Sequence, residues 1–316
     1  MEDQVSLVQS VVAKSINEVE KLIFGQQDCV MSAYVALLSG GHLLLEGVPG
    51  MGKTLLAKSL AKTVNCGFGR IQFTPDLMPL DIIGSSILHE NRFEFHRGPV
   101  FTDLLLADEI NRAPSKTQSA LLEAMQEGTI TADGVTHQLS EVFTVIATQN
   151  PIEQEGTYPL PESEIDRFMM KVVVDFPSEE DELRIMRTHH ARTSTITEDD
   201  IQPSIDRNVL AELRKTVLNV SIADDVMSYA SCLVRATREH VSIMHGASPR
   251  AGIALLKASK ASAAIQGRAF VTPDDVKQWS LPVLRHRLIL KPGAELSGTS
   301  SDDVIRNILA TIPVPT

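Results

Sequence analysis

The stretch that most constrains the fold of this chain is GVPGMGKT, residues 47–54. Its spacing, G-x-x-x-x-G-K-T, is typical of a loop whose backbone N–H groups surround a phosphate chain. A short apolar strand, His42–Glu46, precedes the loop, and apolar residues at helical spacing follow it from Leu56 to Val64. Because phosphates bind at the N-terminus of such a helix, the order of strand, loop and helix predicts an α/β nucleotide-binding fold.

The loop also supplies candidate ligand contacts. We expect Lys53 to neutralise phosphate charge and the Thr54 hydroxyl to bind Mg²⁺. The residues expected to contact the nucleotide here are Gly47, Gly50, Met51, Gly52, Lys53, Thr54 and Leu55.

A second apolar strand, Val100–Glu109, ends in two adjacent carboxylates. A lone Asp-Glu pair would be interpreted as a solvated strand end, but beside a phosphate loop the pair predicts ATP hydrolysis. Asp108 is then the second Mg²⁺ ligand together with Thr54. Glu109 is the candidate general base that polarises the attacking water.

A third apolar strand, Phe143–Thr148, ends in Gln149-Asn150-Pro151. Asn150 could orient the water or touch the terminal phosphate, or it could simply be a turn residue before proline. Between the second and third strands we expect a helix from Ala113-Pro114 to Gly128 and a hairpin at 129–137 around Asp133-Gly134.

Together these segments resemble the AAA+ ATPases and, within them, the MoxR family. GVPGMGKT resembles the Walker A motif, LLLADEINRAP (104–114) resembles Walker B, and ATQNPIEQEGTYPLPESEIDRF (147–168) resembles the sensor-1 region and arginine-finger helix. The last stretch is the most specific, because other ATPases share Walker motifs but not this long loop and its DRF ending. The resemblance implies that Asn150 is sensor 1 and that Arg167 reaches the nucleotide of a neighbouring subunit.

Two arginines have weaker support from the residues alone. Asp166-Arg167 could be a surface ion pair of little energetic value, whereas a finger needs a planar, permanently charged guanidinium. Arg250 follows Ser248-Pro249, a predicted N-cap and first helical residue, where the helix dipole disfavours a cation unless an anion is bound. GASPRAGIALL resembles the sensor-2 helix, which implies that Arg250 contacts the phosphates of its own subunit. An exposed arginine is the alternative.

Two further segments carry a resemblance. LIFGQQDCV (22–30) resembles the segment that packs against adenine, so Ile23 and Gly25 are candidate contacts, with a plain turn between helices as the alternative. Residues 74–101 contain prolines, Gly84 and an alternating segment, which predict an inserted turn and hairpin. This region resembles the family's insert in helix 2, toward the ring pore or substrate face; an elaborated surface loop is the alternative.

The composition changes after a strand at Met169–Asp175. Beyond it, Ser/Thr/Asp-rich helix starts recur and no convincing strand appears. We therefore expect two domains in the 316 residues: an AAA+ α/β core at 1–190, with a parallel sheet flanked by helices, and an all-α lid at 191–316. The single tryptophan, Trp279, is expected in the apolar core.

Charge and composition exclude several function classes. A net charge of −11 disfavours broad attraction to DNA, RNA or anionic lipid, so no nucleic-acid partner is expected. The chain begins without a signal-peptide pattern and has no apolar run long enough to cross a bilayer, which predicts a cytoplasmic protein. Three scattered cysteines, Cys29, Cys66 and Cys232, show neither disulfide nor metal-site spacing and are expected to be buried thiols.

The resemblance implies ATP and Mg²⁺ as cofactors and a homo-oligomeric ring, usually a hexamer. It also implies chaperone-like remodelling of a separate partner protein, often one with a von Willebrand factor A domain. One alternative is a nucleotide switch, which Glu109 and the two arginines argue against. A second is a DNA-directed motor, which the acidic net charge argues against. A third is a magnesium-chelatase subunit, but residues 149–162 resemble MoxR proteins more than they resemble that subunit. A GTPase is disfavoured because no NKxD-type sequence follows the Walker motifs.

Overall fold

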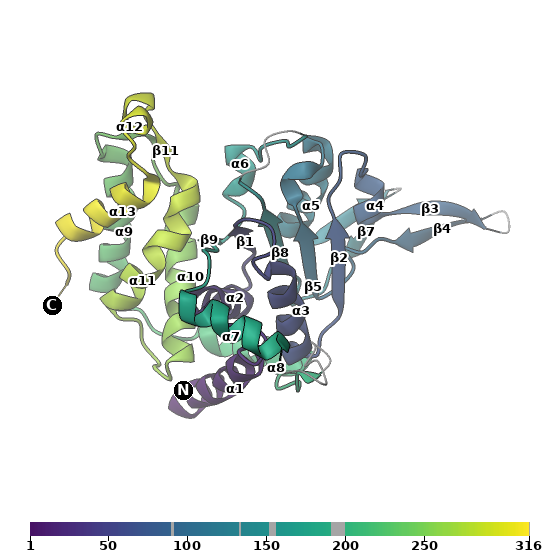
Figure 1. The fold of residues 1–316 in the computed structure, drawn as a ribbon, viewed down its shortest axis with the longest axis horizontal. Helices are drawn as coiled ribbons and strands as arrows, with labels where there is room; N and C mark the ends of the chain where they lie inside the picture. The colour runs from purple at the N-terminus through teal and green to yellow at the C-terminus, as the bar shows by residue number, and fades with distance from the viewer. Residues whose placement is uncertain (90–91, 133, 152–155, 191–199, 316) are drawn as a thin grey trace.

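The computed structural model describes residues 1–89, 92–132, 134–151, 156–190 and 200–315. Its centre is a five-stranded sheet in the order β2-β5-β8-β1-β9, and every neighbouring pair is parallel (Figure 1). The strands are β1 (Leu43–Glu46), β2 (Phe68–Gln72), β5 (Leu104–Asp108), β8 (Thr144–Gln149) and β9 (Met170–Val173). The predicted parallel α/β core is confirmed.

Alternating residues of the central strands enter two separate apolar clusters. Leu104 and Leu106 of β5 belong to one cluster, whereas Leu105 and Ala107 belong to the other. Because successive side chains of a strand point to opposite faces, the sheet is covered on both sides. This explains why β5 and β8 are buried along almost their whole length, as is usual for the central strands of a parallel sheet.

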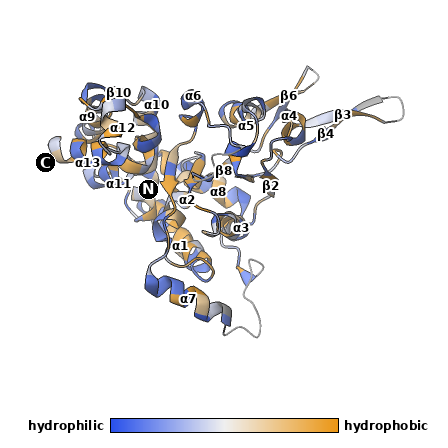
Figure 2. Cartoon of the chain, turned by 45° about the horizontal axis from the view of Figure 1, so that its top comes forward, coloured by the Kyte–Doolittle hydropathy of each residue, from blue (hydrophilic) through white to orange (hydrophobic). Residues whose placement is uncertain are grey.

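The helices of the N-terminal part surround this sheet. They are α1 (Glu2–Val19), α2 (Gln27–Leu38), α3 (Lys53–Val64), α4 (Pro79–Ile83), α5 (Ser115–Glu127), α6 (Glu162–Ile165) and α7 (Glu179–His190), with a short 3-10 turn, η1 (Ile110–Arg112). Gly128 ends α5 with a φ of +63°, as predicted from its position. Helix α7 lies on the outside of the molecule and is mostly hydrophilic (Figure 2).

The expected insert consists of α4 and a hairpin of β3 (Gly84–His89) and β4 (Arg92–Arg97), which projects from the body of the molecule (Figure 1). A second hairpin pairs β6 (Thr129–Ala132) with β7 (Val135–Gln138), also as predicted. Asp133 of its turn lies outside the described residues.

The C-terminal part is helical but contains one small sheet. Its helices are α8 (Arg207–Leu218), α9 (Asp224–Glu239), α10 (Pro249–Ile265), α11 (Pro273–Leu284), α12 (Pro292–Leu296) and α13 (Ser301–Thr311), with a 3-10 turn, η3 (Arg285–Arg287). Strands β10 (Ile243–His245) and β11 (Ile289–Leu290) pair antiparallel, so the expectation of no strand here is wrong. Strands of three and two residues are too short to show a period-two pattern. The predicted domain boundary, between residues 190 and 191, adjoins residues 191–199, which lie outside the described residues.

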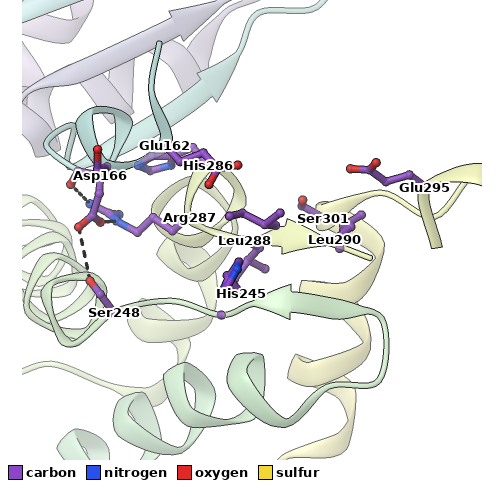
Figure 3. Close-up of a pocket in the computed structure, with 13 residues that line it drawn as sticks. Glu162, Asp166, His245, Ser248, His286, Arg287, Leu288, Leu290, Glu295 and Ser301 are labelled. Carbon is purple, nitrogen blue, oxygen red and sulfur yellow. Dashed lines mark hydrogen bonds and ion pairs between the residues drawn. The ribbon is translucent and has the colours of Figure 1, made fainter. Parts of the chain in front are cut away.

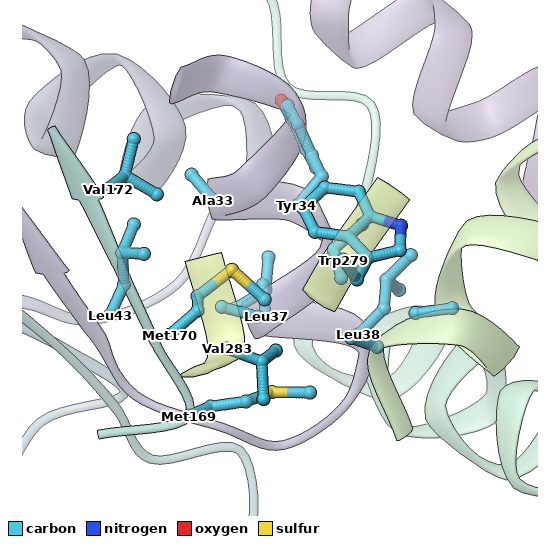
Figure 4. Close-up of a cluster of buried hydrophobic side chains, with 14 of the residues drawn as sticks. Ala33, Tyr34, Leu37, Leu38, Leu43, Met169, Met170, Val172, Trp279 and Val283 are labelled. Atoms are coloured by element: carbon cyan, nitrogen blue, oxygen red, sulfur yellow. The ribbon is translucent and has the colours of Figure 1, made fainter. Parts of the chain in front are cut away.

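A continuous apolar cluster joins the C-terminal helices to the sheet. Tyr34 and Leu37 of α2, Met170 of β9, and Trp279 and Val283 of α11 all belong to it (Figure 4). Trp279 is 3% exposed, which confirms its predicted place in the core. This packing holds α11, and the turn η3 that follows it, against the strand next to β1.

The cysteine prediction holds only in part. Cys29 is buried, and burial raises the pKa of its thiol to about 12, whereas Cys66 is partly buried and Cys232 is exposed. Cys232 lies on the solvent side of the amphipathic helix α9, away from the buried residues that follow helical spacing from Val226 to Thr237. Among the described residues, no helix is long and apolar enough to cross a membrane.

Candidate nucleotide site

The glycine loop between β1 and α3 has a backbone that requires glycine. Gly50 and Gly52 have φ angles of +86° and +74°, which residues with a Cβ rarely adopt. A Cβ on Gly47 would lie 2.8 Å from the carbonyl oxygen of Val174, at the end of β9. No side chain caps the N-terminus of α3 at Lys53, so its first N–H groups can bind an anion.

Lys53 and Thr54 open α3 beside the strand ends. The Lys53 ammonium donates to the carbonyl oxygen of Gly47 and, at 3.4 Å, to that of Gln149. Burial lowers the pKa of Lys53, although the Asp108 and Glu109 carboxylates act in the opposite direction. Two neutral carbonyls are weak partners for a half-buried ammonium, which an anionic phosphate would stabilise better.

The Asp108 carboxylate is the centre of a hydrogen-bond network. Its Oδ2 accepts from Thr54 Oγ1 at 3.1 Å and from Arg70 at 2.8 and 3.2 Å, and its Oδ1 accepts from Thr148 Oγ1 at 2.7 Å. Burial alone would raise the pKa of Asp108, but these hydrogen bonds outweigh it and hold the pKa below its ordinary value. Asp108 is therefore ionised and preorganised beside Thr54.

Glu109 adopts a backbone conformation that is rare for a residue with a side chain. Its φ is +55°, in the left-handed region, and its N–H donates to Thr148 Oγ1 at 2.8 Å. Such strain persists where the surrounding structure holds it, and it often marks functional sites. The Glu109 Oε2 accepts from Gln72 at 2.9 Å and from Arg112 at 3.3 Å.

Asn150 directly follows β8 and is buried, with 4% exposed. The preceding carbonyl, of Gln149, accepts from the Gly47 N–H at 3.2 Å, so the end of β8 adjoins the glycine loop. The Asn150 carbonyl accepts from Asn111 Nδ2 at 3.3 Å. The structure thus brings Asn150 to the site, and its role as sensor 1 stays a prediction.

The two candidate base contacts have different surroundings. Ile23 is 6% exposed and packs in the main apolar cluster. Gly25 has a φ of +70° and lines a cavity of about 200 Å³ between residues 25–29 and 172–176. The neighbouring Gln26 donates to the Met51 carbonyl at 2.7 Å, which connects this cavity to the glycine loop. Contact of either residue with a base stays a prediction.

The side chains of Met51 and Leu55 are directed toward the apolar core. Met51 is 7% exposed and presents only its backbone to Gln26, and Leu55 packs partly buried against the main cluster. Any contact of these two residues with a nucleotide would therefore be made mainly through the backbone.

The two predicted arginines lie on different elements. Arg250 is the second residue of α10, is about half exposed, and has its guanidinium 4.0 Å from Asp166. Arg167 follows α6 and is partly exposed; across the described residues, its guanidinium makes no ion pair or hydrogen bond. Asp166 pairs instead with Arg287, at 2.6 Å, so the surface pair considered for Asp166 and Arg167 does not form.

Sequence reasoning missed several residues that complete the site: Arg70, Gln72, Thr148 and Arg287. Polar residues alternating at the end of β2 were the only local signal for the first two. The others depend on which strands and helices become neighbours.

The oxygen donors present suit Mg²⁺. In the part of the chain that the structure describes, no group of three or more His, Cys, Asp or Glu residues could hold a metal ion. Thr54 Oγ1 and Asp108 Oδ2 supply two adjacent hard oxygen atoms. This is the usual protein share for Mg²⁺, which completes its shell with water and phosphate oxygens.

Known proteins share both parts of this chain. Residues 42–170 match the model of the ATPase family associated with various cellular activities (AAA), and residues 235–308 match the AAA lid domain. The chain is 42% identical to Chaperone MoxR1 of Mycobacterium tuberculosis, over 96% of this chain and 82% of that protein. It is 31% identical to Protein MoxR of Paracoccus denitrificans, over 93% of each. A crystal structure of a protein from Cytophaga hutchinsonii matches with a TM-score of 0.92 and 41% identity, over 100% of this chain and 98% of that one.

Proposed function

Because the chain belongs to the MoxR family of AAA ATPases, we propose that it hydrolyses ATP between the glycine loop, Asp108 and Glu109. The observation that carries this site assignment is the convergence of Lys53, Thr54, Asp108 and Glu109 at one edge of the sheet. Ligands of open α/β sheets bind at this edge, outside the carboxyl ends of the strands.

The residues have separate roles in the proposed reaction. Lys53 binds phosphate oxygens, and Thr54 and Asp108 hold Mg²⁺. When bound, Mg²⁺ neutralises charge on the phosphate oxygens. Glu109 orients the water whose oxygen attacks the γ-phosphorus as the bond to the bridging oxygen of ADP breaks.

Three further residues complete the proposal. Asn150 hydrogen-bonds the water or the terminal phosphate, Arg250 contacts the phosphates of its own subunit, and Arg167 contacts those of a neighbour. Each supplies a donor or positive charge where negative charge develops.

Binding requires two groups to change partners. The Lys53 ammonium exchanges the Gly47 and Gln149 carbonyls for phosphate oxygens, and Arg70 withdraws from the Asp108 oxygen that Thr54 also contacts. Arg70 is about half exposed on an edge strand, so its guanidinium has room to move.

We propose a homo-oligomeric ring, a hexamer, in which Arg167 acts on the adjacent subunit. Two observations support it: the Arg167 guanidinium has no partner among the described residues, and Asp166 is engaged elsewhere. A charged planar group that its own chain leaves unused is suited to insertion beside a neighbour's phosphates.

Steady-state ATPase rate against protein concentration, with particle mass followed in parallel, tests the ring. Specific activity should rise as the ring assembles, and Arg167→Ala should assemble but turn over about a thousandfold more slowly. Arg306→Ala, on the exposed face of α13, is the matched control and should behave as wild type. A rate independent of concentration together with an active Arg167→Ala would overturn the trans assignment.

We propose that hydrolysis drives chaperone-like remodelling of a separate protein. The favoured class of partner is a protein that contains a von Willebrand factor A domain. Exposed apolar side chains on the insert and the second hairpin support a partner-binding face: Leu80, Ile87, Leu88 and Val135 are each at least half exposed. The Ile87→Ser, Leu88→Ser double variant should keep its ATPase rate. It should lose the ability to suppress aggregation of thermally unfolded citrate synthase; full retention would place the partner site elsewhere.

The remaining alternatives make different predictions. A nucleotide switch would bind ATP with little turnover, and a DNA-directed motor would bind DNA with a steep salt dependence. A magnesium-chelatase-like subunit would couple turnover to metal insertion. The division into a core at 1–190 and a lid at 191–316, and the cytoplasmic location, also stay predictions.

A further inference from the structure

Arg287 is an arginine of the C-terminal part whose side chain is buried, with 2% exposed. It lies in η3, directly after α11, and all three guanidinium nitrogens are used. Nε donates to Asp166 Oδ1 at 2.6 Å, and Nη2 donates to the carbonyls of Asp166 and Phe168 at 3.1 and 2.7 Å. Nη1 donates to the carbonyls of Met169, at 3.0 Å, and Val283.

Most of these acceptors belong to one turn, residues 166–169. The neighbouring His286 reinforces the contact, with its Nε2 3.1 Å from the Phe168 carbonyl. On its far side the turn is fixed to the sheet, because the Met169 N–H donates to the His42 carbonyl at 2.9 Å. Arg167 is the residue of this turn whose carbonyl Arg287 does not contact, and its side chain takes no part in these hydrogen bonds.

The Asp166 carboxylate connects the same turn to α10 (Figure 3). Its Oδ1 is held by Arg287, whereas its Oδ2 lies 3.4 Å from the Ser248 hydroxyl and 4.0 Å from the Arg250 guanidinium. Oδ1 therefore has a short hydrogen bond to a buried arginine, whereas Oδ2 has two longer contacts. Arg250 can leave without exposing an uncompensated carboxylate, because Arg287 stays.

We propose that Arg287 is a positioning residue for hydrolysis. It fixes the 166–169 turn that presents Arg167 to the neighbouring subunit, and its charge neutralises Asp166, which leaves Arg250 available for the phosphates of its own subunit. This inference rests on the proposed function, since it assumes that Arg167 acts in trans. It makes the placement of the finger depend on the position of η3 and α11.

The geometry explains why the position needs arginine. A fork of three nitrogens reaches carbonyls in different directions around one turn, whereas a lysine ammonium could satisfy only some of them. Arg287→Lys keeps the charge that Asp166 requires in a buried place, so it should fold while loosening the turn. Misplacing a catalytic group by about 1 Å can cost a hundredfold in rate.

The matched control comes from the same turn. Arg285, two residues earlier, pairs with Asp302 of α13 at 2.9 and 3.1 Å and makes no hydrogen bond or ion pair with residues 166–169. Arg285→Lys therefore perturbs a partly buried arginine in the same 3-10 turn without touching the finger segment.

The test uses full-length chains in mixed assemblies. Each variant is measured alone for ATP affinity, assembly and turnover, and then mixed with Glu109→Gln subunits, which carry an intact Arg167 but lack the proposed base. If Arg287 serves the finger, Arg287→Lys alone should bind ATP normally, assemble, and lose about a hundredfold in kcat. Mixing should restore turnover, because normal fingers from Glu109→Gln subunits then reach the variant's intact sites. Arg285→Lys should need no rescue.

Arg167→Ala mixed with Glu109→Gln separates failure of the inference from failure of the proposed function. Rescue of Arg167→Ala without rescue of Arg287→Lys would overturn the inference and leave the trans finger in place. Absence of rescue for Arg167→Ala would overturn the trans finger and the inference with it. A wild-type kcat in both Arg287→Lys and Arg287→Met would also overturn the inference about Arg287. Asp166→Asn, which keeps an acceptor for Arg287 Nε, gives a second readout and should show a smaller loss with the same rescue.

Discussion

The side-chain amide of Gln72 donates to Glu109 Oε2 at 2.9 Å, from the strand that pairs with β5. Gln72 lies beside Asp108 in the β2–β5 register, so it reaches the carboxylate one residue beyond. The carboxylate proposed to polarise water is thus already occupied by an amide and, at 3.3 Å, by Arg112. Water must compete with these donors for Glu109.

Removing the Gln72 amide should therefore accelerate basal hydrolysis. A hydrogen bond to a charged group contributes on the order of 1 kcal/mol at a solvated site, so Gln72→Leu should raise basal kcat about three- to tenfold. ATP affinity should stay the same. Gln126→Leu, an exposed change on α5, is the control. A lower kcat in Gln72→Leu would mean that the amide positions Glu109 productively rather than holding it back.

Thr148→Val should weaken both stability and metal binding. The Thr148 hydroxyl is buried, donates to Asp108 Oδ1 and accepts from the Glu109 N–H, and valine removes it with little change in volume. Leaving these groups unpaired should lower the free energy of unfolding by about 1–3 kcal/mol. The pKa of Asp108 should rise, and more Mg²⁺ should be needed for half-maximal ATPase activity.

Urea unfolding and a Mg²⁺ titration measure the two effects. Thr131→Val removes a hydroxyl from an exposed hairpin pair and should change stability by less than about 0.5 kcal/mol. Equal urea midpoints for Thr148→Val and wild type would show that Thr148 does not hold the network together.

His42 should make the fold sensitive to mild acid. Burial, with a smaller contribution from Arg214 and against the opposing hydrogen bond to the Met125 carbonyl, lowers the pKa of His42 from 6.5 to about 4. Its Nδ1 accepts from the Val145 N–H at 3.0 Å, so the ring is neutral in the fold. The unfolded chain therefore binds the extra proton between pH 6.5 and 4.

The free energy of unfolding should accordingly be at its full value above pH 6.5 and fall by about 3 kcal/mol as the pH drops to 4. Since His286 is also held neutral by burial, the His42 share is the difference between wild type and His42→Gln. Between pH 6.5 and 4 the wild-type curve should fall by about 3 kcal/mol relative to the His42→Gln curve. Parallel curves over this window would contradict the assignment. The lowered pKa of Asp108 begins to affect stability only below about pH 5, and because both proteins contain Asp108 this contribution cancels in the difference.

Arg250 and Arg167 should differ in mixed assemblies. Arg250 begins α10 and is proposed to act on its own subunit's phosphates, so Glu109→Gln partners cannot supply a replacement. Arg250→Ala mixed with Glu109→Gln should stay slow, whereas Arg167→Ala should recover. Recovery of both variants would show that Arg250 also reaches across the subunit boundary.

Much of the site could be predicted because its signals are local. GVPGMGKT places Lys53 and Thr54 at the start of a helix, and an apolar strand ending in Asp108 and Glu109 must deliver both carboxylates to one sheet edge. The insert hairpin and the burial of Trp279 also followed from local pattern and composition.

The remaining contacts depend on tertiary neighbours. Arg70 and Gln72 reach the carboxylates only because β2 pairs with β5, and Thr148 does so because β8 lies on the other side of β5. Arg287 meets Asp166 across 121 residues of chain. No spacing rule connects such positions. The short strands β10 and β11 likewise depend on a tertiary contact, because they pair segments that are more than 40 residues apart in the chain.

The most direct test of the account is the behaviour of Glu109→Gln with radiolabelled ATP, measuring equilibrium binding and product formation on the same assembled protein. The amide keeps the size of the side chain but cannot accept a proton, so binding should equal that of wild type while turnover falls by about a hundredfold or more. Glu123→Gln, an exposed change on α5, should match wild type in both. Wild-type turnover by Glu109→Gln would contradict the central claim that this strained residue positions the attacking water.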